Sequence, residues 1–478
     1  MKGGVAQTRP IKQMTKTATA IPVTITKTKA SLQRLLALLL IGVFSQQLYA
    51  ANATVIVDYN QRKQTLAGFG ASITWIASDL QNFSAADQTA ILNTLYSTNS
   101  PSAGLSIIRA GSMLCEFNPS PATYDWNHPL IQGEISWMNR VKSTYGVNQF
   151  LVTTWTPPAF MKDNNSCSNG GSVLAQYYPD LANTSVLWLQ NAKASLGQDI
   201  NVWSVQNEPT TSPSYDSANY TPAQFISFVT GHLKPAMQNA GLTTKIMVPE
   251  PAVYGGASFF DSNWGFPILN DATMRADVDI MATHGYAQTS DLGDPSQAVQ
   301  QYNKPFWQTE VYFGRSYSGT ISDALGVAKS IYRALNLGNL NAWFYWWAMD
   351  FSSGNGGVIS YSNTAWTYQV PKRAYALGNF SRFIRPGSVM LGSSSTSSNL
   401  QVTAVSPTSG IVALVLTNSS KQSISATVSL ANVGSSPSTV TPFRTSATEN
   451  QVQLSPIPVG GGTFVVTIPA QSIVTLVG

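Results

Sequence analysis

Two glutamates occupy equivalent places in the sequence, each directly after a short apolar run. Glu208 lies at the end of NVWSVQNEP, and Glu310 lies at the end of PFWQTEV. Hydrolysis of a glycosidic bond needs two carboxyl groups, one to protonate the leaving oxygen and one to attack the anomeric carbon or activate water. If the two carboxylates share a cleft at about 5 to 5.5 Å, the chemistry is a double displacement with retention of configuration.

Either glutamate alone could instead be a structural carboxylate, salt-bridged at a strand end. The context of the first one argues for function, because Asn207 precedes it and Pro209 follows it. Other chemistries find little support. The three histidines lack metal-ligand spacing, and the sequence has no GxSxG elbow, P-loop or dinucleotide fingerprint after a strand. The sequence therefore predicts a hydrolase that uses no metal and no cofactor.

Eight short apolar runs, separated by stretches of helical period, must position these carboxylates. The runs begin near Gly68, Leu105, Gln149, Asn201, Lys245, Val278, Pro305 and Asn341. This alternation is typical of parallel strands with crossover helices, and eight units predict a (β/α)8 TIM barrel. Hydroxyl residues at predicted helix starts, Ser84 and Thr221, fit this register. Glu208 and Glu310 then follow the fourth and seventh strands, which face each other across the barrel mouth.

A second module follows the barrel, since the composition after Arg385 changes to alternating Ser, Thr, Val and Gly. This pattern predicts a β-sandwich, which the early strand at 54–59 could join from the other end. Bracing the barrel is the better interpretation of this module than binding polysaccharide. The predicted divisions are a signal peptide at 1–50, an N-terminal strand joining the sandwich at 51–65, the catalytic barrel at 66–385 and the sandwich at 386–478.

The basic excess of the chain is confined to its start. Of 27 Lys and Arg against 22 Asp and Glu, seven basic residues and no acid fall within residues 1–50. That stretch ends in an apolar run, 35–44, which is typical of a secretory signal cleaved after Ala50, with a retained amphipathic anchor as the alternative. We therefore expect a secreted protein, extracellular or periplasmic, that binds neither nucleic acid nor, once cleaved, a membrane, and that is a monomer.

The two cysteines and the polar composition carry further expectations. Cys115 and Cys167 are the only cysteines, and export permits either one bridge or two free thiols. Only 10% of residues are charged, whereas the chain has 12 Trp and 19 Tyr. Such a surface suits neutral ligands such as sugars, although abundant Ser and Thr are also ordinary in secreted β-rich proteins.

Five motifs together resemble glycoside hydrolase family 30. They are SVQNEP, TEVY, GFGAS, THGY and FYWW, in matching order and spacing. The similarity runs from about Thr54 to the C-terminus and looks closest to the bacterial endo-β-1,4-xylanase branch. The resemblance implies that Glu208 is the general acid/base, that Glu310 is the nucleophile, and that the substrate is a polysaccharide.

The same resemblance implies roles for the residues around this pair. Asn207 would bind the 2-hydroxyl of the sugar being cleaved, while Trp155 and Trp347 would wall the subsite that holds it. Tyr286 could orient Glu310, whereas His284 is a flanking residue that could equally be structural. Arg109, at the end of the second strand, could keep a catalytic carboxylate ionised or satisfy a core network.

One loop departs from the family pattern. In glucuronoxylan-specific members this loop carries an arginine that grips the glucuronate branch, but here it reads AMDFSSGNGG, with Asp350 in it. A carboxylate would repel an acidic branch unless Arg315 substitutes for the missing arginine. The resemblance, together with this departure, implies a plant cell-wall endo-β-1,4-xylanase that does not depend on glucuronate. The alternatives are a β-1,6-glucanase, a β-1,6-galactanase, a glucosylceramidase-like enzyme, or a non-catalytic carbohydrate-binding protein.

Overall fold

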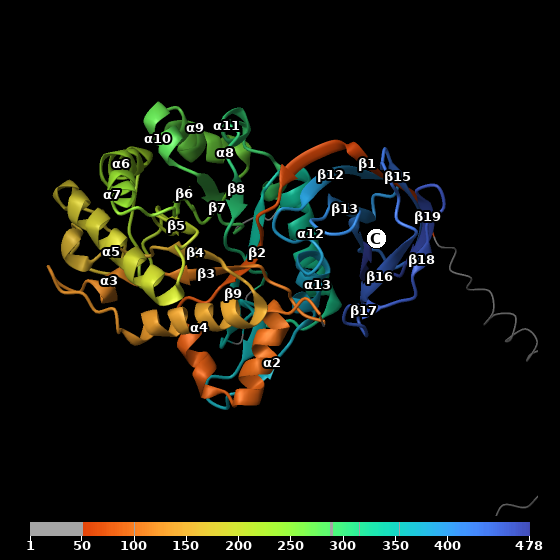
Figure 1. Cartoon of the computed structure of the whole chain (residues 1–478), viewed down its shortest axis with the longest axis horizontal. Coiled ribbons are helices and arrows are strands. Elements are labelled where there is room, and N and C mark those ends of the chain that lie inside the picture. Colours follow the sequence, from red (N-terminus) through yellow and green to blue (C-terminus); the bar gives the residue numbers. More distant parts are fainter. Residues whose placement is uncertain (1–50, 100, 287–289, 315, 353) are drawn as a thin grey trace, which may run out of the picture. The chain divides into compact units, whose positions relative to one another are not determined.

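The computed structural model of the chain describes residues 51–99, 101–286, 290–314, 316–352 and 354–478 (Figure 1). The predicted signal peptide at 1–50 and Arg315 lie outside these described residues. Among the helices of the described part, no helix combines the length and the apolar character needed to cross a membrane.

Eight parallel strands close into a barrel, which confirms the predicted fold class. They are β2 (Gly68–Ser72), β3 (Ile107–Gly111), β4 (Gln149–Thr153), β5 (Val202–Ser204), β6 (Lys245–Pro249), β7 (Ile280–Thr283), β8 (Phe306–Gln308) and β9 (Ala342–Asp350). Each strand pairs with the next, and β9 pairs with both β8 and β2, so the ring has no open edge. Beyond the ring, β10 (Gly357–Tyr361) pairs with β9, and β11 (Tyr368–Gln369) pairs with β10.

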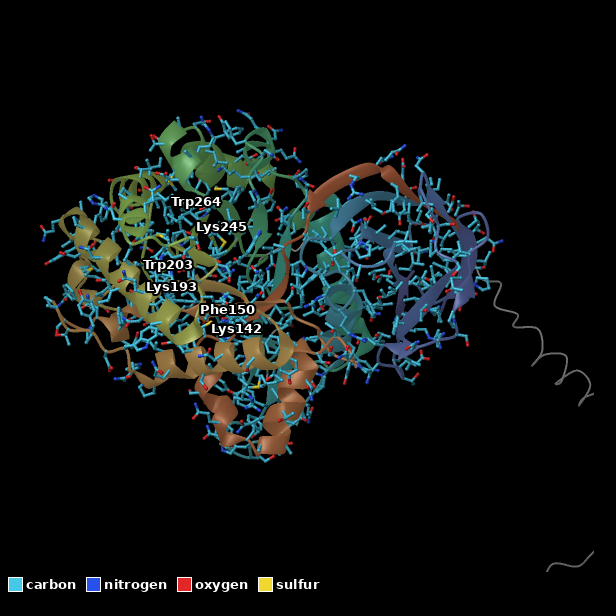
Figure 2. All side chains as sticks on the ribbon, viewed as in Figure 1. Lys142, Phe150, Lys193, Trp203, Lys245 and Trp264 are labelled. Atoms are coloured by element: carbon cyan, nitrogen blue, oxygen red, sulfur yellow. A yellow bond between two sulfur atoms is a disulfide. The ribbon has the colours of Figure 1, made fainter. Side chains whose placement is uncertain are left out.

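Alternation along each strand separates the barrel interior from the helix-facing side. Val202 belongs to the cluster inside the barrel with Ile107, Leu151 and Trp307. Its neighbour Trp203 belongs to the outer core, where its ring lies 5.6 Å from that of Trp188 in α5. Trp203 and Phe150, both labelled in Figure 2, are almost fully buried. The near-continuous apolar runs of the sequence therefore reflect strands that are covered on both faces.

Helices connect the strands and cover the barrel. The helices are α2 (Ala85–Tyr96), α3 (Leu114–Phe117), α4 (Pro129–Tyr145), α5 (Tyr178–Leu196), α6 (Pro222–Phe228), α7 (Lys234–Asn239), α8 (Ala257–Phe260), α9 (Phe266–Leu269), α10 (Ala272–Asp277), α11 (Gln297–Gln301), α12 (Ile321–Tyr332) and α13 (Lys372–Ser381). The predicted caps are present: the Ser84 hydroxyl accepts from the amide of Asp87, and Thr221 forms a capping box with Gln224. These bonds satisfy amides that have no partner within the helix.

The C-terminal module is a β-sandwich that includes the N-terminal strand. Its strands are β1 (Ala51–Thr65), β12 (Val389–Ser395), β13 (Leu400–Ser406), β14 (Ala413–Asn418), β15 (Ile424–Ala431), β16 (Thr439–Thr445), β17 (Val452–Gln453), β18 (Ile457–Pro458), β19 (Thr463–Ile468) and β20 (Ser472–Val477). β1 lies between β12 and β15, antiparallel to the first and parallel to the second. Alternate side chains of β1, such as Val55 and Val57, are fully buried in the sandwich core.

Buried polar contacts join the sandwich to the last barrel helix. The Asn379 amide of α13 donates to the Thr475 hydroxyl of β20 at 2.9 Å and to the carbonyl of Phe443 in β16 at 3.1 Å. Both Asn379 and Thr475 are fully buried. Buried hydrogen bonds of this kind are costly to break, because an unpaired partner stays desolvated.

Candidate active site

The two candidate glutamates meet at the C-terminal ends of the barrel strands. Glu208 follows β5 and Glu310 follows β8, and both side chains are buried, with 8% and 5% exposure. One carboxylate oxygen of each, together with a ring nitrogen of His284, lies within 4.8 Å of the others. The closed barrel thus brings together two acids that are about a hundred residues apart in the sequence.

Arg109 links the predicted residues into one network. From β3, its Nη1 donates to Glu310 Oε2 at 2.6 Å and its Nη2 donates to Asn207 Oδ1 at 2.7 Å. Tyr286 donates its phenolic proton to the other oxygen of Glu310 at 2.8 Å. The Glu310 carboxylate is therefore held on both oxygens by donors, and the amide nitrogen of Asn207 is left for another partner.

His284, the first residue after β7, contacts the other glutamate. Its Nδ1 lies 3.0 Å from Glu208 Oε1, and the imidazole is fully buried. Glu208 Oε2 accepts from the Thr211 hydroxyl at 3.3 Å. The two glutamates thus have different hydrogen-bond partners, while His284 Nε2 also lies 3.8 Å from Glu310 Oε2.

A third buried acid, Glu250, completes the charge network, and the sequence interpretation missed it. It follows β6, it is fully buried, and its Oε1 lies 3.5 Å from Arg109 and 3.8 Å from His284 Nε2. Its Oε2 accepts from the hydroxyl of Ser204. The signal that could have found it is the one used for the others, since Glu250 directly follows the apolar run KIMVP.

The backbone is unusual at two of these acids. Glu208 and Glu250 have φ angles of 43° and 57°, in the left-handed region that non-glycine residues rarely adopt. The two backbones are tied to each other, because the amide of Glu208 donates to the carbonyl of Glu250 at 3.0 Å. Such conformations cost of order 1–3 kcal/mol each and concentrate at functional sites.

Burial and charge shift the pKa values of the cluster in opposite directions. Burial would raise the pKa of Glu250, but the charge of Arg109, with His284 and Ser204, lowers it to about 2. Burial would lower the pKa of His284, but the charge of Glu310 and the hydrogen bond to Glu208 raise it to about 9. His284 is consequently protonated near neutral pH.

The two candidate glutamates titrate differently from each other. Burial raises the pKa of Glu310, and the negative charge of Glu208 raises it further. The positive charges of His284 and Arg109 lower it, but the net shift is upward. For Glu208, burial is outweighed by the hydrogen bond and charge of His284, and its pKa is lowered. The cluster contains three carboxyl groups and two cations, so it can hold one further proton on a carboxylate. Glu208 and Glu310 interact closely, and this proton is therefore shared by the two rather than fixed on one of them.

Glu208, His284 and Glu310 also offer three metal-ligand atoms at close range. The charges around them disfavour a cation. The Arg109 guanidinium already neutralises Glu310 at 2.6 Å.

Aromatic side chains wall a cleft of about 430 Å³ above these acids. Its lining comprises Trp75, Trp155, Asn207, Glu208, Tyr215, Tyr286, Glu310, Tyr312, Trp346 and Trp347. Trp155 lies over the Arg109 guanidinium, 4.6 Å from its ring centroid, and Trp347 donates its indole proton to the carbonyl of Thr74 at 3.0 Å. Aromatic faces with a few fixed polar groups suit the apolar face and hydroxyls of a sugar ring.

Four of the wall residues were not predicted as site residues: Trp75, Tyr215, Tyr312 and Trp346. Alternation along a strand would turn only one of Trp346 and Trp347 toward the cleft, yet both line it. Their rings stack at 4.9 Å, and the pairing of β9 with β2 shifts register at this point. This irregularity, which no sequence signal marked, allows both rings to face the same side.

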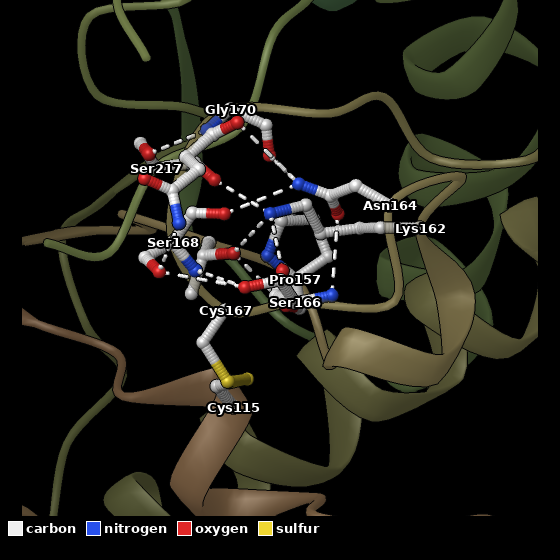
Figure 3. The surroundings of a disulfide bond; sticks show 11 residues. Cys115, Pro157, Lys162, Asn164, Ser166, Cys167, Ser168, Gly170 and Ser217 are labelled. Carbon is white, nitrogen blue, oxygen red and sulfur yellow. Dashed lines mark hydrogen bonds between the residues drawn. A yellow bond between two sulfur atoms is a disulfide. The ribbon is translucent and has the colours of Figure 1, made fainter. Parts of the chain in front are cut away.

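A disulfide joins Cys115 of α3 to Cys167 in the loop that precedes α5, with 6.1 Å between their Cα atoms (Figure 3). Next to it, the buried amine of Lys162 donates to the carbonyls of Ser166 and Ser217 at 2.7 and 2.6 Å. Ser217 belongs to the segment that follows Glu208 and carries Tyr215. The disulfide and Lys162 thus brace the segment that forms one wall of the cleft.

Asp350 does not act as the sequence interpretation supposed. It ends β9 instead of standing in a loop, and it is only 1% exposed. Its carboxylate accepts from the amides of Ser352 and Gly356 at 2.7 and 2.8 Å. The side chain therefore holds the following turn and makes no direct contact with the cleft, because local amides capture its oxygens.

A larger hollow, of about 560 Å³, lies at the opposite end of the barrel. It is lined by residues at the N-terminal ends of strands, such as Lys245, which Figure 2 labels, and Gln149. It holds none of the three acids. The smaller cleft, at the end where barrels of this kind carry their active sites, is lined by Glu208 and Glu310 and is therefore the candidate site.

Comparison with known proteins agrees with the fold. Residues 387–476 match the model of the glycosyl hydrolase family 30 β-sandwich domain. The chain is 28% identical over 342 residues to the glucuronoxylanase XynC of Bacillus subtilis (strain 168), covering 68% of this chain and 73% of that protein. It is 25% identical over 372 residues to an endo-1,6-β-D-glucanase of Neurospora crassa, covering 69% of this chain and 72% of the relative.

A solved structure extends the likeness to both modules. The catalytic domain of the GH30 xylanase C from Talaromyces cellulolyticus superposes with a TM-score of 0.75 at 27% sequence identity. The match covers 89% of this chain and 99% of that domain.

Proposed function

The chain belongs to glycoside hydrolase family 30, and from this premise we propose that it is a retaining endo-β-1,4-xylanase that does not require glucuronate branches. One observation carries the retaining mechanism: the buried carboxylates that follow β5 and β8 have oxygen atoms within 4.8 Å of each other. This short distance favours the separation of about 5 to 5.5 Å between the carboxyl groups of retaining enzymes over the separation of about 6.5 to 9.5 Å in inverting enzymes.

In the proposed first step, the Glu310 carboxylate bonds to the anomeric carbon while the bond from that carbon to the leaving oxygen breaks. Glu208 gives its proton to that oxygen, so the leaving group departs as a neutral alcohol. In the second step, a water gives a proton to Glu208 as its oxygen attacks the anomeric carbon. The bond from that carbon to Glu310 breaks as the bond to the water oxygen forms, and both acids return to their starting states.

Hydrogen-bond donors support this division of roles. Glu310 accepts from Arg109 and Tyr286, which favours its ionised, nucleophilic form. The pKa directions of the two acids taken one by one run the other way. The donors on Glu310 are short and include the charged Arg109, whereas Glu208 Oε2 has only the 3.3 Å contact with the neutral Thr211 hydroxyl, so Glu208 Oε2 is the oxygen that can carry the shared proton.

The surrounding residues have proposed supporting roles. The amide nitrogen of Asn207, whose oxygen is occupied by Arg109, would donate to the 2-hydroxyl of the sugar. Trp155 and Trp347 would pack against the faces of the ring in the same subsite. His284 would hold Glu208 in place through its 3.0 Å contact.

Independence from glucuronate rests on the segment after β9. Residues 348–357 contain no basic side chain, so no arginine or lysine of this segment can pair with a uronate. The Neurospora relative makes β-1,6-glucan the second candidate substrate.

The decisive experiment measures products from xylan, glucuronoxylan, pustulan and β-1,6-galactan by mass spectrometry, and the anomer first released by proton NMR. We expect β-anomeric xylo-oligosaccharides at similar kcat/KM with and without glucuronate. Activity confined to decorated xylan or to β-1,6-glucan would overturn the substrate, and α-anomeric products would overturn retention.

A matched pair of variants tests the roles. Glu310→Gln should lower kcat by at least about 10³-fold while leaving oligosaccharide binding measurable. Glu208→Gln should slow natural substrates far more than aryl glycosides, whose leaving groups need little protonation. Equal losses on both substrate types would contradict the role of Glu208.

A further inference from the structure

A buried acid lies behind the catalytic cleft and takes no part in the proposed reaction. Glu134 of α4 is only 2% exposed, and its Oε2 accepts from the backbone amide of Gly111, at the end of β3, at 2.9 Å. The backbone amide of Trp75 faces the same carboxyl group. Within the part of the chain that the structure describes, Glu134 Oε1 has no hydrogen-bond partner. A buried carboxyl group with an unpaired oxygen lowers stability, and this points to a role other than packing.

The turn that Glu134 touches, at residues 74–76, carries part of the aromatic wall. Trp75 lines the cleft, and its ring lies 5.4 Å from that of Trp155 and 6.3 Å from that of Trp346. The carbonyl of the preceding residue, Thr74, accepts the indole proton of Trp347 at 3.0 Å. The turn therefore places Trp75 directly and Trp347 through a hydrogen bond.

This turn is strained and needs support from its surroundings. Trp75 has a φ angle of 64°, in the left-handed region that a bulky residue rarely adopts, and such a conformation persists only when neighbouring structure holds it. Helix α4 approaches the turn at two consecutive residues. Gly133 lies so close to the chain after the turn that an added Cβ would stand 3.0 Å from the amide nitrogen of Ser78, and Glu134 supplies the buried acceptor.

The carboxyl group acts here as an acceptor rather than as a charge. Burial raises the pKa of Glu134 well above its usual value, although the amides of Gly111 and Trp75 lower it. A neutral carboxyl group still accepts through its carbonyl oxygen. Among the hydrogen bonds and ion pairs of the described residues, none joins Glu134 to Glu208 or Glu310. Any influence of this side chain on the cleft therefore passes through the turn.

We propose that Glu134 is a positioning residue that holds the turn at 74–76, and with it the Trp75 and Trp347 walls, in the arrangement that binds sugar. The proposal rests on the proposed function for the identity of the ligand in the cleft. It makes α4, which contributes no side chain to the lining of the cleft, a determinant of substrate affinity.

The kinetic test compares two variants of similar size on xylohexaose, well below the melting temperature. Glu134→Met removes the acceptor and should raise KM roughly tenfold with little change in kcat, because the walls contact the sugar equally in the ground state and the transition state. Glu134→Gln keeps an acceptor oxygen and should retain the wild-type KM. Glu134→Ala removes the same acceptor with a smaller side chain and replaces the Met variant if that variant does not fold.

The control separates a loss of stability from a loss of position. Met138 lies one turn further along α4, is fully buried and does not line the cleft. Met138→Ala should lower the melting temperature through the cavity that it leaves, while KM stays unchanged. A rise in KM for Met138→Ala equal to that for Glu134→Met would reduce Glu134 to a structural residue and overturn the proposal.

Two further measurements test the route through Trp75. In a double-mutant cycle, Glu134→Met should add little to the rise in KM that Trp75→Ala causes, whereas fully additive effects would overturn the proposal. Near-ultraviolet circular dichroism reports the packing of the Trp75, Trp155 and Trp346 rings without any substrate. The signal should change in Glu134→Met and not in Glu134→Gln, and an unchanged spectrum in both would overturn the proposal. If the wild type neither binds nor cleaves xylohexaose, the proposed function fails, and the spectra still decide whether Glu134 positions Trp75.

Discussion

Replacing Glu250 by Gln removes one negative charge from the network while keeping its shape. In the folded chain the pKa of Glu250 is about 2, against 4.5 for an exposed glutamate, mainly because Arg109 outweighs the effect of burial. This lowering corresponds to about 3 kcal/mol of stability, in the range of about 3–5 kcal/mol for breaking a buried ion pair. Because the folded-state pKa is depressed, this stability is present above pH 4.5 and is lost as the pH falls toward 2.

The assay is thermal unfolding of the wild type and Glu250→Gln between pH 3 and pH 8. The midpoint of the variant should lie well below that of the wild type at neutral pH, and the gap should shrink below pH 4.5. Asp125→Asn, which removes an exposed carboxylate, should show no comparable gap. A gap that stays constant from pH 8 to pH 3 would refute the reasoning, since a charge-independent packing defect does not titrate.

Three further predictions concern neighbouring groups. Tyr286→Phe removes a hydrogen bond to the Glu310 carboxylate and should lower kcat/KM roughly 10- to 100-fold at an unchanged melting temperature; an unchanged rate would exclude this bond from catalysis. His284→Asn should destabilise the fold at pH 6. Because the folded-state pKa of His284 is raised, the difference in stability from the wild type should vanish as the pH rises through about 9. Calorimetry from pH 6 to pH 10 measures this difference, and a difference that persists at pH 10 would contradict the prediction. Replacing Cys115 and Cys167 by Ser removes a disulfide that links residues 52 positions apart and should lower the free energy of unfolding by about 4 kcal/mol. Reduction of the wild type without a fall in melting temperature would contradict this prediction.

The positions of Glu208 and Glu310 could be predicted because strand ends are a local signal. An apolar run followed by an acid is visible in the sequence, and parallel closure brings all such acids to one face. The same rule would have included Glu250, which has the same context. Hydrolysis needs only two carboxyl groups, and Glu250 lacks the asparagine that precedes Glu208, so its neighbours along the chain do not mark it as functional.

Other features had no local signal. From the sequence, Asp350 looked free to repel an anion. In the folded chain the amide of Gly356 donates to the Asp350 carboxylate, and the Asp350 side chain is buried. Tyr215 and Trp75 reach the cleft from segments whose paths depend on a disulfide and on a positive φ angle. Such placements are set by contacts between distant parts of the chain, which periodicity does not report.

The sequence by itself determined the eight-fold alternation, the sandwich and the two acids at strand ends, since these follow from hydrophobic periods and from neighbours along the chain. Only the tertiary structure decided how the acids share charge. Arg109, Glu250 and His284 come from three different strand regions, and Glu250 lies 3.5 Å from Arg109 and 3.8 Å from His284, distances that the arrangement of the strands in space creates. Electrostatic coupling falls with separation and rises with burial, and neither quantity can be read from the order of residues.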